Sequence, residues 1–374
     1  MNLPQPQLVD TEESLKACAA TCSQSDAIAV DTEFMRTDTF YPLLGLIQIS
    51  DGDSVWLIDP LPIEDFSALE DLFNNRNVTK IFHSCSEDLE VLRHQLGLVP
   101  TPIFDTQIAA AFLGYGHSRG YSALVDAVLD IKLEKHETRS DWLQRPLTPS
   151  QLQYAAEDVY FLIKVYRCLL PGLEDTGRRG WLAEDMDDLL TAAREPECGE
   201  DYYLRVKGAW KLSTAQLAVL RELTRWREQE ARTKNRPRNR IISDKMFLDV
   251  IDAKPRSLAD LSRIEGFHSG LVRRYGEKIL AIAGEAADVN GLEKLPSPLD
   301  RSTRQLLADC RALVDQKAAA LGLAAEVLAR KKDLEELIRS AQQGRAALPE
   351  KLAQGWRHQI IGKDLYNHVT HTVL

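Results

Sequence analysis

The residues with the clearest chemical meaning are four carboxylates and one tyrosine in the first half of the chain. Asp31 and Glu33 stand in A-V-D-T-E-F, Asp88 in H-S-C-S-E-D-L, and Tyr154 with Asp158 in Y-A-A-E-D-V. Residues two apart on a strand share a face, and residues four apart on a helix share a flank. The apolar run before Asp31 predicts a strand and the apolar periodicity around Tyr154 predicts a helix, so each pair is expected to lie side by side.

Carboxylates gathered in one place repel one another, and burying them without a partner costs free energy. A fold keeps such a cluster when cations neutralise it. Oxygen ligands without His or Cys suit Mg²⁺ or Mn²⁺ rather than Zn²⁺. Two such ions about 3.5–4 Å apart promote in-line displacement at phosphorus. The residue types therefore predict phosphodiester cleavage with two divalent cations, Mg²⁺ or Mn²⁺.

The order and spacing of these motifs resemble the tyrosine-containing branch of the DEDD 3′→5′ exonucleases, and the surrounding sequence is similar to bacterial ribonuclease D. Four stretches carry the resemblance: D-T-E-F-M-R-T-D-T-F-Y-P-L-L-G-L-I-Q-I-S (31–50), H-S-C-S-E-D-L-E-V-L (83–92), F-D-T-Q-I-A-A-A-F (104–112) and T-R-S-D-W-L-Q-R-P-L-T (138–148). Each motif is short, but four in the right order and spacing make a specific match.

The resemblance implies a 3′→5′ exoribonuclease that releases nucleoside 5′-monophosphates from RNA 3′ ends, with transfer-RNA precursors as expected substrates. Asp31, Glu33, Asp88 and Asp158 would hold the two cations, and Tyr154 would orient the attacking water. Neither a membrane nor an obligate protein partner is implied. Two alternatives stay open, a DNA-directed 3′→5′ exonuclease and a non-catalytic RNA-binding scaffold. The presence of all five residues argues against the scaffold.

The expected fold is an α/β domain of the ribonuclease-H-like exonuclease kind with a mixed sheet, followed by two all-α domains. Two apolar runs around D-G-D predict a hairpin. The first domain should contain strands near 27–33, 44–50, 54–58, 79–83 and 102–104 and helices near 10–23, 86–96, 105–113, 121–130 and 148–169. Residues 211–285 resemble the HRDC domain, a helical module of RecQ-type helicases and ribonuclease D, and the family resemblance implies a second, degenerate copy near the C-terminus.

Domain boundaries are expected where acidic or proline-rich stretches interrupt the apolar patterns. Acidic residues at 184–188 and 195–201 would end the first domain, and P-S-P at 296–298 would link the two helical ones. The predicted domains are 1–195, 207–290 and 298–374.

Three local signals bear on how the acids are positioned. Thr148-Pro149-Ser150-Gln151 predicts a capped helix start before Tyr154. Ser84-x-x-Glu87 predicts a capping box before Asp88, which would give Glu87 a structural role. His83 ends an apolar run, so a structural, hydrogen-bonded histidine is favoured over a proton carrier.

Charge is distributed unevenly along the chain. A net charge of −10 argues against a protein that coats nucleic acid with its whole surface. Residues 221–240, however, hold eight Lys and Arg against three Glu, a local charge of +5. This stretch is a candidate phosphate-binding surface, with a solvated helix and polar loop as the alternative. Its candidate contacts are Arg232, Lys234, Arg236, Arg238 and Arg240.

Aromatic residues just after the first acidic motif are candidates for stacking on bases, because stacking tolerates any sequence. Phe34 is an equal candidate for stacking and for the core, whereas Phe40 and Tyr41 are expected in the core.

The composition is that of a cytoplasmic protein with two or three domains. Its 374 residues include no apolar run approaching 18, and the N-terminus has no basic, apolar leader. Six cysteines without a C-x-x-C motif are expected to be reduced.

Overall fold

A computed structural model describes residues 3–373 apart from 134–139, 196–198, 286–288, 290 and 298. The chain forms two compact units. The first unit contains Met1–Met35, Pro42–Glu195 and Asp300–Leu374, and the second contains Arg36–Tyr41 and Pro196–Leu299. In the described part of the chain, no helix is both long and apolar enough to cross a membrane.

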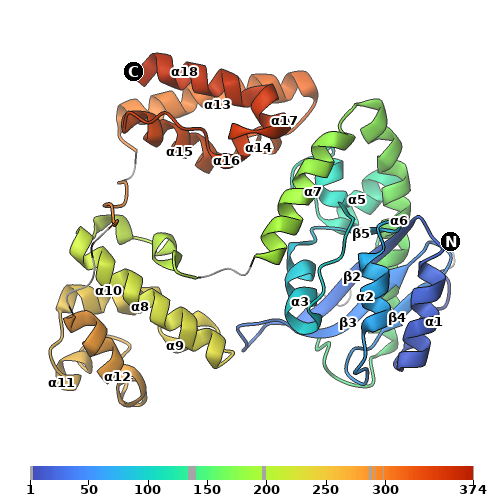
Figure 1. The fold of residues 1–374 in the computed structure, drawn as a ribbon, viewed down its shortest axis with the longest axis horizontal. Coiled ribbons are helices and arrows are strands. Elements are labelled where there is room, and N and C mark those ends of the chain that lie inside the picture. Colours follow the sequence, from blue (N-terminus) through green and yellow to red (C-terminus); the bar gives the residue numbers. More distant parts are fainter. Residues whose placement is uncertain are drawn as a thin grey trace. The chain divides into compact units, whose positions relative to one another are not determined.

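A six-stranded mixed sheet forms the centre of the α/β domain in the first unit (Figure 1). In spatial order its strands are β1 (Gln7–Val9), β4 (Val55–Ile58), β3 (Leu43–Ser50), β2 (Ala27–Met35), β5 (Thr79–Phe82) and β6 (Ile103–Asp105). Strands β2, β3 and β4 are antiparallel, β5 and β6 continue the sheet parallel to β2, and β1 runs parallel to β4. The predicted mixed sheet is confirmed.

The hairpin between β3 and β4 turns at D-G-D, as predicted. Gly52 has a φ of +101°, a backbone conformation that side chains disfavour. The Asp51 carboxylate accepts hydrogen bonds from the backbone N–H groups of Asp53 (2.9 Å) and Ser54 (2.8 Å), which closes the turn.

Helices cover both faces of the sheet. Helices α1, α2 and α3 lie on one face, and the long helix α6 crosses the other (Figure 1). The helices of this domain are α1 (Glu12–Cys22), α2 (Ser67–Asn74), α3 (Ser86–Leu96), α4 (Thr106–Phe112), α5 (Tyr121–Leu129), α6 (Pro149–Asp175) and α7 (Arg179–Arg194). Sequence patterns missed β1, α2 and α7.

The starts of α6 and α3 test the two capping predictions. At α6 the prediction is confirmed, because Thr148 and Gln151 form a reciprocal capping box and Pro149 is the first helical residue. At α3 the prediction is wrong. Ser84 has a φ of +65° and makes no cap, and Cys85 occupies the N-cap position without capping the helix through its side chain.

The second helical domain belongs to the same unit as the α/β domain. It consists of α13 (Arg301–Leu321), α14 (Ala325–Leu328), α15 (Lys331–Gln342), α16 (Glu350–Ala353), α17 (Gly355–Arg357), a π-helical turn (His358–Gly362) and α18 (Lys363–Val373). It contacts α7, the last helix before the predicted boundary at residue 195. Acidic residues 184–188 lie inside α7, where two of them bind α17, and the division between the two units follows Glu195.

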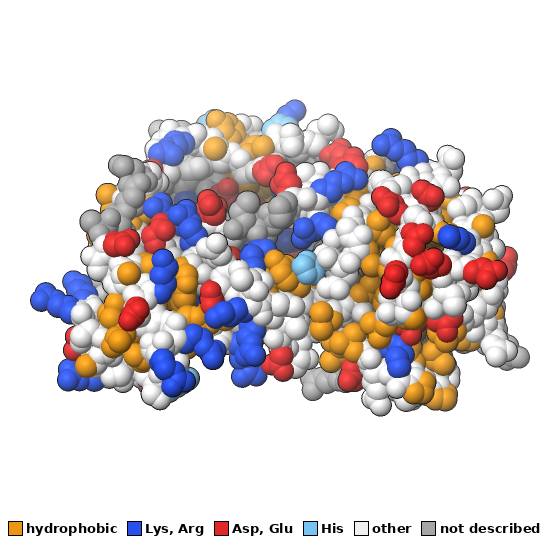
Figure 2. Space-filling view, turned by 60° about the horizontal axis from the view of Figure 1, so that its bottom comes forward, with side chains coloured by type: hydrophobic (Ala, Val, Ile, Leu, Met, Phe, Trp, Pro, Cys, Tyr) orange, Lys and Arg blue, Asp and Glu red, His pale blue; other side chains and the backbone are white. Residues whose placement is uncertain are grey.

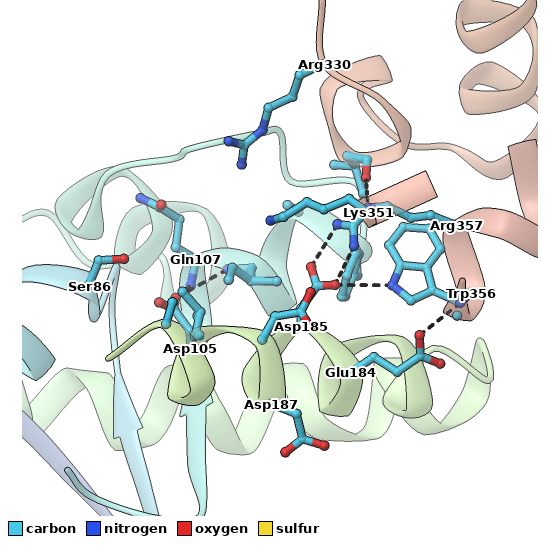
Figure 3. A pocket seen from close by; sticks show the side chains of 18 of the residues that line it. Ser86, Asp105, Gln107, Glu184, Asp185, Asp187, Arg330, Lys351, Trp356 and Arg357 are labelled. Atoms are coloured by element: carbon cyan, nitrogen blue, oxygen red, sulfur yellow. Dashed lines mark hydrogen bonds and ion pairs between the residues drawn. The ribbon is translucent and has the colours of Figure 1, made fainter. Parts of the chain in front are cut away.

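The interface between α7 and α17 combines stacked rings with a nearly buried ion pair. The indoles of Trp181 and Trp356 stack with centroids 4.3 Å apart. Asp185 accepts hydrogen bonds from both terminal nitrogens of Arg357, at 2.5 and 2.8 Å, and from Trp356 Nε1 at 3.2 Å (Figure 3). Glu184 accepts from the backbone N–H of Trp356 at 2.9 Å. These contacts attach the second helical domain to the α/β domain.

The second unit is the first helical domain together with the loop between β2 and β3. Its elements are two 3₁₀ turns (Tyr202–Arg205 and Ala209–Lys211), α8 (Thr214–Thr233), α9 (Arg238–Ile241), α10 (Asp244–Ala253), α11 (Leu258–Leu261) and α12 (Ser269–Gly284). The Asn235 side chain accepts hydrogen bonds from the N–H groups of Phe40 (3.0 Å) and Tyr41 (2.9 Å). The Phe40 ring packs against the core of this helical domain. The predicted boundary stretch 195–201 and the linker 296–298 lie partly outside the described residues.

The ion pair at the α7–α17 interface should contribute measurably to stability. Asp185→Ala leaves the Arg357 guanidinium, whose side chain is only 14% exposed, without its carboxylate, so we expect a loss of about 2–3 kcal/mol in the free energy of unfolding. Arg179→Ala is the matched control on the same helix. It breaks an ion pair with Glu174 whose side chains are 64% and 51% exposed, and should cost less than about 1 kcal/mol. Denaturant unfolding of the full chain measures both, and equal losses would contradict this account of the interface.

Candidate active site

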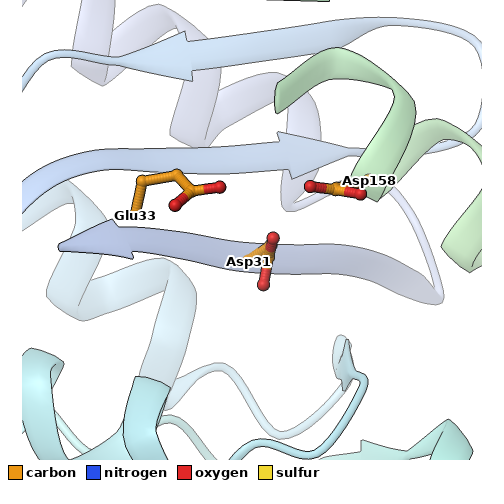
Figure 4. A group of neighbouring side chains, drawn as sticks. All are labelled: Asp31, Glu33 and Asp158. Carbon is orange, nitrogen blue, oxygen red and sulfur yellow. The ribbon is translucent and has the colours of Figure 1, made fainter. Parts of the chain in front are cut away.

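Three of the predicted acids converge in the α/β domain. Asp31 and Glu33 project from β2, and Asp158 projects toward them from α6 (Figure 4). One carboxylate oxygen from each of the three lies within 4.8 Å of the other two, and all three side chains are half-buried. A strand of alternating faces and a helix crossing above it thus bring together residues 127 positions apart in sequence (158 − 31).

Asp88, the fourth predicted acid, approaches from the first turn of α3 and is buried. It accepts a hydrogen bond from the Thr32 hydroxyl. Thr32 stands between Asp31 and Glu33 and therefore faces the opposite side of the strand. Asp88 is close enough for its charge to raise the pKa of Glu33.

Burial and mutual repulsion keep protons on this cluster in the absence of cations. The pKa of Asp31 is raised well above its ordinary value, mainly by burial and secondly by the negative charge of Asp158. The pKa of Asp88 is raised in the same way, mainly by burial and secondly by the negative charge of Asp31. Burial, with Asp31 next, raises the pKa of Glu33 to about 10. Burial raises the pKa of Asp158 to about 7, against a lowering by its hydrogen bond from Tyr154. Positive charge placed here would reverse these shifts.

Tyr154 stands beside the cluster as predicted. Its half-buried phenol donates a hydrogen bond to Asp158, one helical turn along α6. Burial, with the charges of Asp158 and Glu33, raises the pKa of the phenol above its ordinary value. Tyr154 therefore stays protonated at neutral pH, where its phenol can donate a hydrogen bond.

A segment that sequence patterns did not single out as functional holds the ring next to Tyr154. Arg145 donates to both oxygens of Asp59 (2.5 and 2.7 Å), to the carbonyl of Trp142 (2.8 Å) and to the carbonyl of Gly45 (2.7 Å). A Cβ at Gly45 would lie 2.6 Å from the Trp142 carbonyl oxygen, so only glycine lets this segment cross β3. The Trp142 ring lies 6.2 Å from that of Tyr154. The motif around Trp142 contributed to the family resemblance, and its first two residues, 138 and 139, lie outside the described residues.

Asp105 positions the start of α3 and with it Asp88. Its buried carboxylate accepts from the N–H groups of Ser84 (3.1 Å) and Cys85 (2.9 Å) and also caps α4 through Gln107 N (2.8 Å). One side chain thus joins two helix starts, in place of the predicted capping box.

Two further rings lie behind the cluster. The Tyr121 hydroxyl donates to the carbonyl of Glu157 at 3.1 Å, and burial together with Asp158 raises its pKa. Sequence patterns missed this residue. His83 is hydrogen-bonded through both ring nitrogens, to Thr106 Oγ1 (2.9 Å) and the Arg119 carbonyl (3.0 Å). Burial lowers its pKa, so it is the structural histidine that was expected.

Several of the predicted phosphate-binding residues have partners within the second unit. Arg232 and Arg238 both pair with the buried Glu228, and their guanidinium groups lie 4.9 and 4.7 Å from the Phe40 ring. Phe40 is thus in a core, as expected, but in that of the helical domain.

The other three residues of the predicted phosphate-binding set are exposed. Lys234 pairs with Glu230, and Arg240 lies 3.4 Å from Asp38. Arg236 makes no ion pair with any residue that the structure describes. On the part of Figure 2 that shows the helical domain (lower left), Lys and Arg side chains alternate with acidic and apolar ones.

Phe34 is half-buried on β2 next to Glu33. A bulge follows at this point, because the register with β3 shifts between Glu33 and Phe34. The ring therefore lies at an irregular part of the sheet, beside the acids.

A separate hollow of about 890 Å³ lies between α4, α7 and the second helical domain. Its lining mixes acids such as Asp105 and Asp187 with bases such as Arg330 and Lys351 (Figure 3). None of the predicted site residues lines it. The acid cluster, not this hollow, concentrates the chemistry.

Comparison with known proteins is consistent along the whole chain. Residues 6–174 match the 3′–5′ exonuclease family, residues 216–283 the HRDC domain, and residues 302–365 the C-terminal HRDC domain of ribonuclease D. Ribonuclease D of Pseudomonas paraeruginosa is 43% identical over 368 residues, covering 97% of each chain. The chain belongs to the ribonuclease D family. Ribonuclease D of Escherichia coli is 34% identical over 96% of this chain and 97% of its own.

Solved structures agree with this membership. The crystal structure of E. coli RNase D superposes over 100% of both chains with a TM-score of 0.87 at 32% identity. The catalytic core of RRP6 from Trypanosoma brucei covers 76% of this chain and 80% of its own, with a TM-score of 0.60 at 27% identity. The first structure extends the likeness to both helical domains.

The acid cluster has the composition of a site for hard divalent cations, which 3′–5′ exonucleases of this family use. Its ligands are all carboxylate oxygens, which suit Mg²⁺ or Mn²⁺. The repulsion among the acids is the cost that bound cations would remove.

The pH dependence of stability follows from the raised carboxylate pKa values. A group whose pKa is higher in the folded state takes up a proton on folding, so its contribution falls as pH rises from the unfolded value, about 4, toward the folded one. The contribution of Asp158, with a folded pKa of about 7, should therefore become increasingly unfavourable in the cation-free protein as pH rises from 4 to 7 and stay so above pH 7. We expect Asp158→Asn to raise the melting temperature in EDTA at pH 8, to have little effect at about pH 4, where the carboxyl is protonated in the folded state, and to abolish stabilisation by Mn²⁺. The same difference in melting temperature between wild type and variant at both pH values would contradict the raised pKa that burial gives Asp158.

Proposed function

We propose that the chain is a 3′→5′ exoribonuclease that removes nucleoside 5′-monophosphates one at a time from RNA 3′ ends in the cytoplasm. The convergence of Asp31, Glu33 and Asp158 beside Tyr154 carries this proposal. The E. coli relative, described as an exoribonuclease involved in structured RNA processing, supports RNA as the substrate. Transfer-RNA precursors are structured RNAs with 3′ extensions, and we propose them as substrates.

In this mechanism Asp31, Glu33, Asp88 and Asp158 would hold two Mg²⁺ or Mn²⁺ ions. Such ions would make the attacking water more acidic and would neutralise charge on the attacking and leaving oxygens. Tyr154 orients the water through its protonated phenol, whose raised pKa excludes it as the base. Trp142 and Arg145 keep the phenol in place, and Thr32 holds Asp88.

A 3′-tailed RNA, labelled at its 5′ end, distinguishes this function from the two alternatives. We expect the labelled RNA to shorten stepwise in the presence of Mg²⁺ or Mn²⁺, with release of nucleoside 5′-monophosphates. No degradation is expected in EDTA or with the Asp31→Asn variant. A DNA oligonucleotide of the same sequence is the matched substrate, since it differs only in lacking the 2′-hydroxyls and in carrying thymine methyls in place of uracil. Faster digestion of DNA would favour a DNA-directed enzyme, and binding of RNA without cleavage under any cation would favour the scaffold.

We further propose that Arg232, Lys234, Arg236, Arg238 and Arg240 contribute to RNA binding by contacting phosphates. The exposed Arg236, which has no ion pair among the described residues, is best placed to do so without loss of an internal contact. Arg238, in contrast, would have to give up its hydrogen bonds to Glu228, at 2.5 and 2.7 Å, to contact a phosphate. Phe34 is proposed to stack on the terminal base, which its position next to Glu33 supports.

Comparing two neighbouring arginines separates phosphate binding from internal structure. Arg236→Ala should reduce the slope of log affinity against log salt by about 0.7 for single-stranded RNA and leave the melting temperature unchanged. Arg238→Ala should lower the melting temperature, because it leaves the carboxylate of Glu228, only 4% exposed, with fewer partners. Binding of RNA at several salt concentrations gives the slopes. Superimposable lines for the wild type and Arg236→Ala would mean that this arginine is an ordinary solvated residue.

A further inference from the structure

One buried amide near the acid cluster has no hydrogen-bond partner among the described residues. Gln48, in the middle of β3, is fully buried, and neither its Nε2 nor its Oε1 makes a hydrogen bond to any residue that the structure describes. Buried amides are almost always paired, because an unpaired one has lost its bonds to water without replacement. An apolar side chain of similar size at this position would avoid this cost, so the choice of glutamine needs an explanation.

The register of the sheet places Gln48 beside an acid. Gln48 is directly opposite Asp31 across the β2–β3 ladder, so both side chains lie on the same face of the sheet. Opposite residues in such a pair have Cβ atoms about 4.5–5.5 Å apart, within reach of a glutamine amide. This is the face that α6 covers and on which Asp158 meets Asp31.

The neighbours of Gln48 on the same face offer its amide little else. Leu46 lies opposite Glu33, and Leu57 flanks Gln48 from β4; both are apolar and buried. Ser50, two residues along, already donates to the Ser54 carbonyl at 2.8 Å and accepts from Gly52 N at 3.1 Å. Asp31 is therefore the natural acceptor for the Gln48 amide.

We infer that Gln48 is a positioning residue, whose Nε2 donates a hydrogen bond to the Asp31 carboxylate when that carboxylate holds a cation. The inference rests on the proposed function. A carboxylate that holds a cation through one oxygen keeps lone pairs free, and a second-layer donor fixes its orientation. The unpaired amide thus lowers the stability of the cation-free protein, and its hydrogen bond to Asp31 in the cation-bound protein offsets this loss.

If Gln48 has this role, one substitution should increase the stability of the cation-free protein and weaken its binding of cations. Gln48→Met keeps length and volume but removes both polar atoms. In EDTA it should raise the melting temperature, because the unpaired amide is gone. It should also weaken Mn²⁺ binding about 10–100-fold, as loss of a second-layer partner does, and slow cleavage of 3′-tailed RNA. A merely structural glutamine would not combine a more stable protein with a weaker cation site.

The test uses the full chain, with Ser50→Ala as the matched control on the same strand and face. Ser50→Ala removes a buried polar group that is already paired, so it should lower the melting temperature equally in EDTA and in Mn²⁺ and leave Mn²⁺ affinity unchanged. Calorimetric titration with Mn²⁺ alone gives the affinities, and thermal unfolding gives the stabilities. Gln48→Leu serves as a second apolar replacement.

The outcomes separate this inference from the proposed function. Unchanged Mn²⁺ affinity in Gln48→Met, with binding intact in the wild type, would overturn the role of Gln48 alone. A melting temperature below that of the wild type in EDTA for both apolar variants, or failure of both to fold, would do the same. Absence of Mn²⁺ binding in the wild type would overturn the proposed function as well.

Discussion

Mutual repulsion among carboxylates is the constraint on which the rest of the α/β domain depends. Asp31 and Glu33 are adjacent on β2, and Asp158 approaches from α6 until oxygens of all three lie within 4.8 Å of one another. No isolated segment would adopt this arrangement, because protons or cations are needed to offset the charge. The fold therefore imposes it from several rigid elements: a central strand, a capped helix, and a helix start fixed by Asp105. In the function that we propose, cation binding offsets that repulsion and makes the cluster catalytic.

Local patterns predicted those parts of the site that depend on residues close in sequence. Alternation along β2 placed Asp31 beside Glu33, and the Thr148 cap placed the start of the Tyr154 helix. The capping box at Ser84 failed because the backbone N–H groups there bind Asp105, about 20 residues away. The pairing of the acidic stretch in α7 left no local signal, because its partner, Arg357, lies 172 residues further on.

Contacts that depend on register or on distant loops left no local signal. Gln48 reads as one more residue of an apolar strand, and only the pairing with β2 shows that it faces Asp31. Arg145 belongs to a motif that helped to indicate the family, but its role as a clamp on Trp142 and Gly45 needs the folded sheet. The basic stretch illustrates the converse. Its positive charge is plain in the sequence, yet two of its arginines form ion pairs with Glu228 inside the helical domain.

The number of Mn²⁺ ions bound per chain tests the central claim most directly. Calorimetric titration of the full chain with Mn²⁺ at pH 8 should show two ions bound to the wild type. Asp31→Asn should lose this binding, because Asp31 stands at the centre of the cluster. Release of protons on binding to the wild type should accompany it, since the raised pKa of Glu33, about 10, keeps a proton on the cation-free site at pH 8. Mn²⁺ binding by Asp31→Asn equal to that of the wild type would contradict the account.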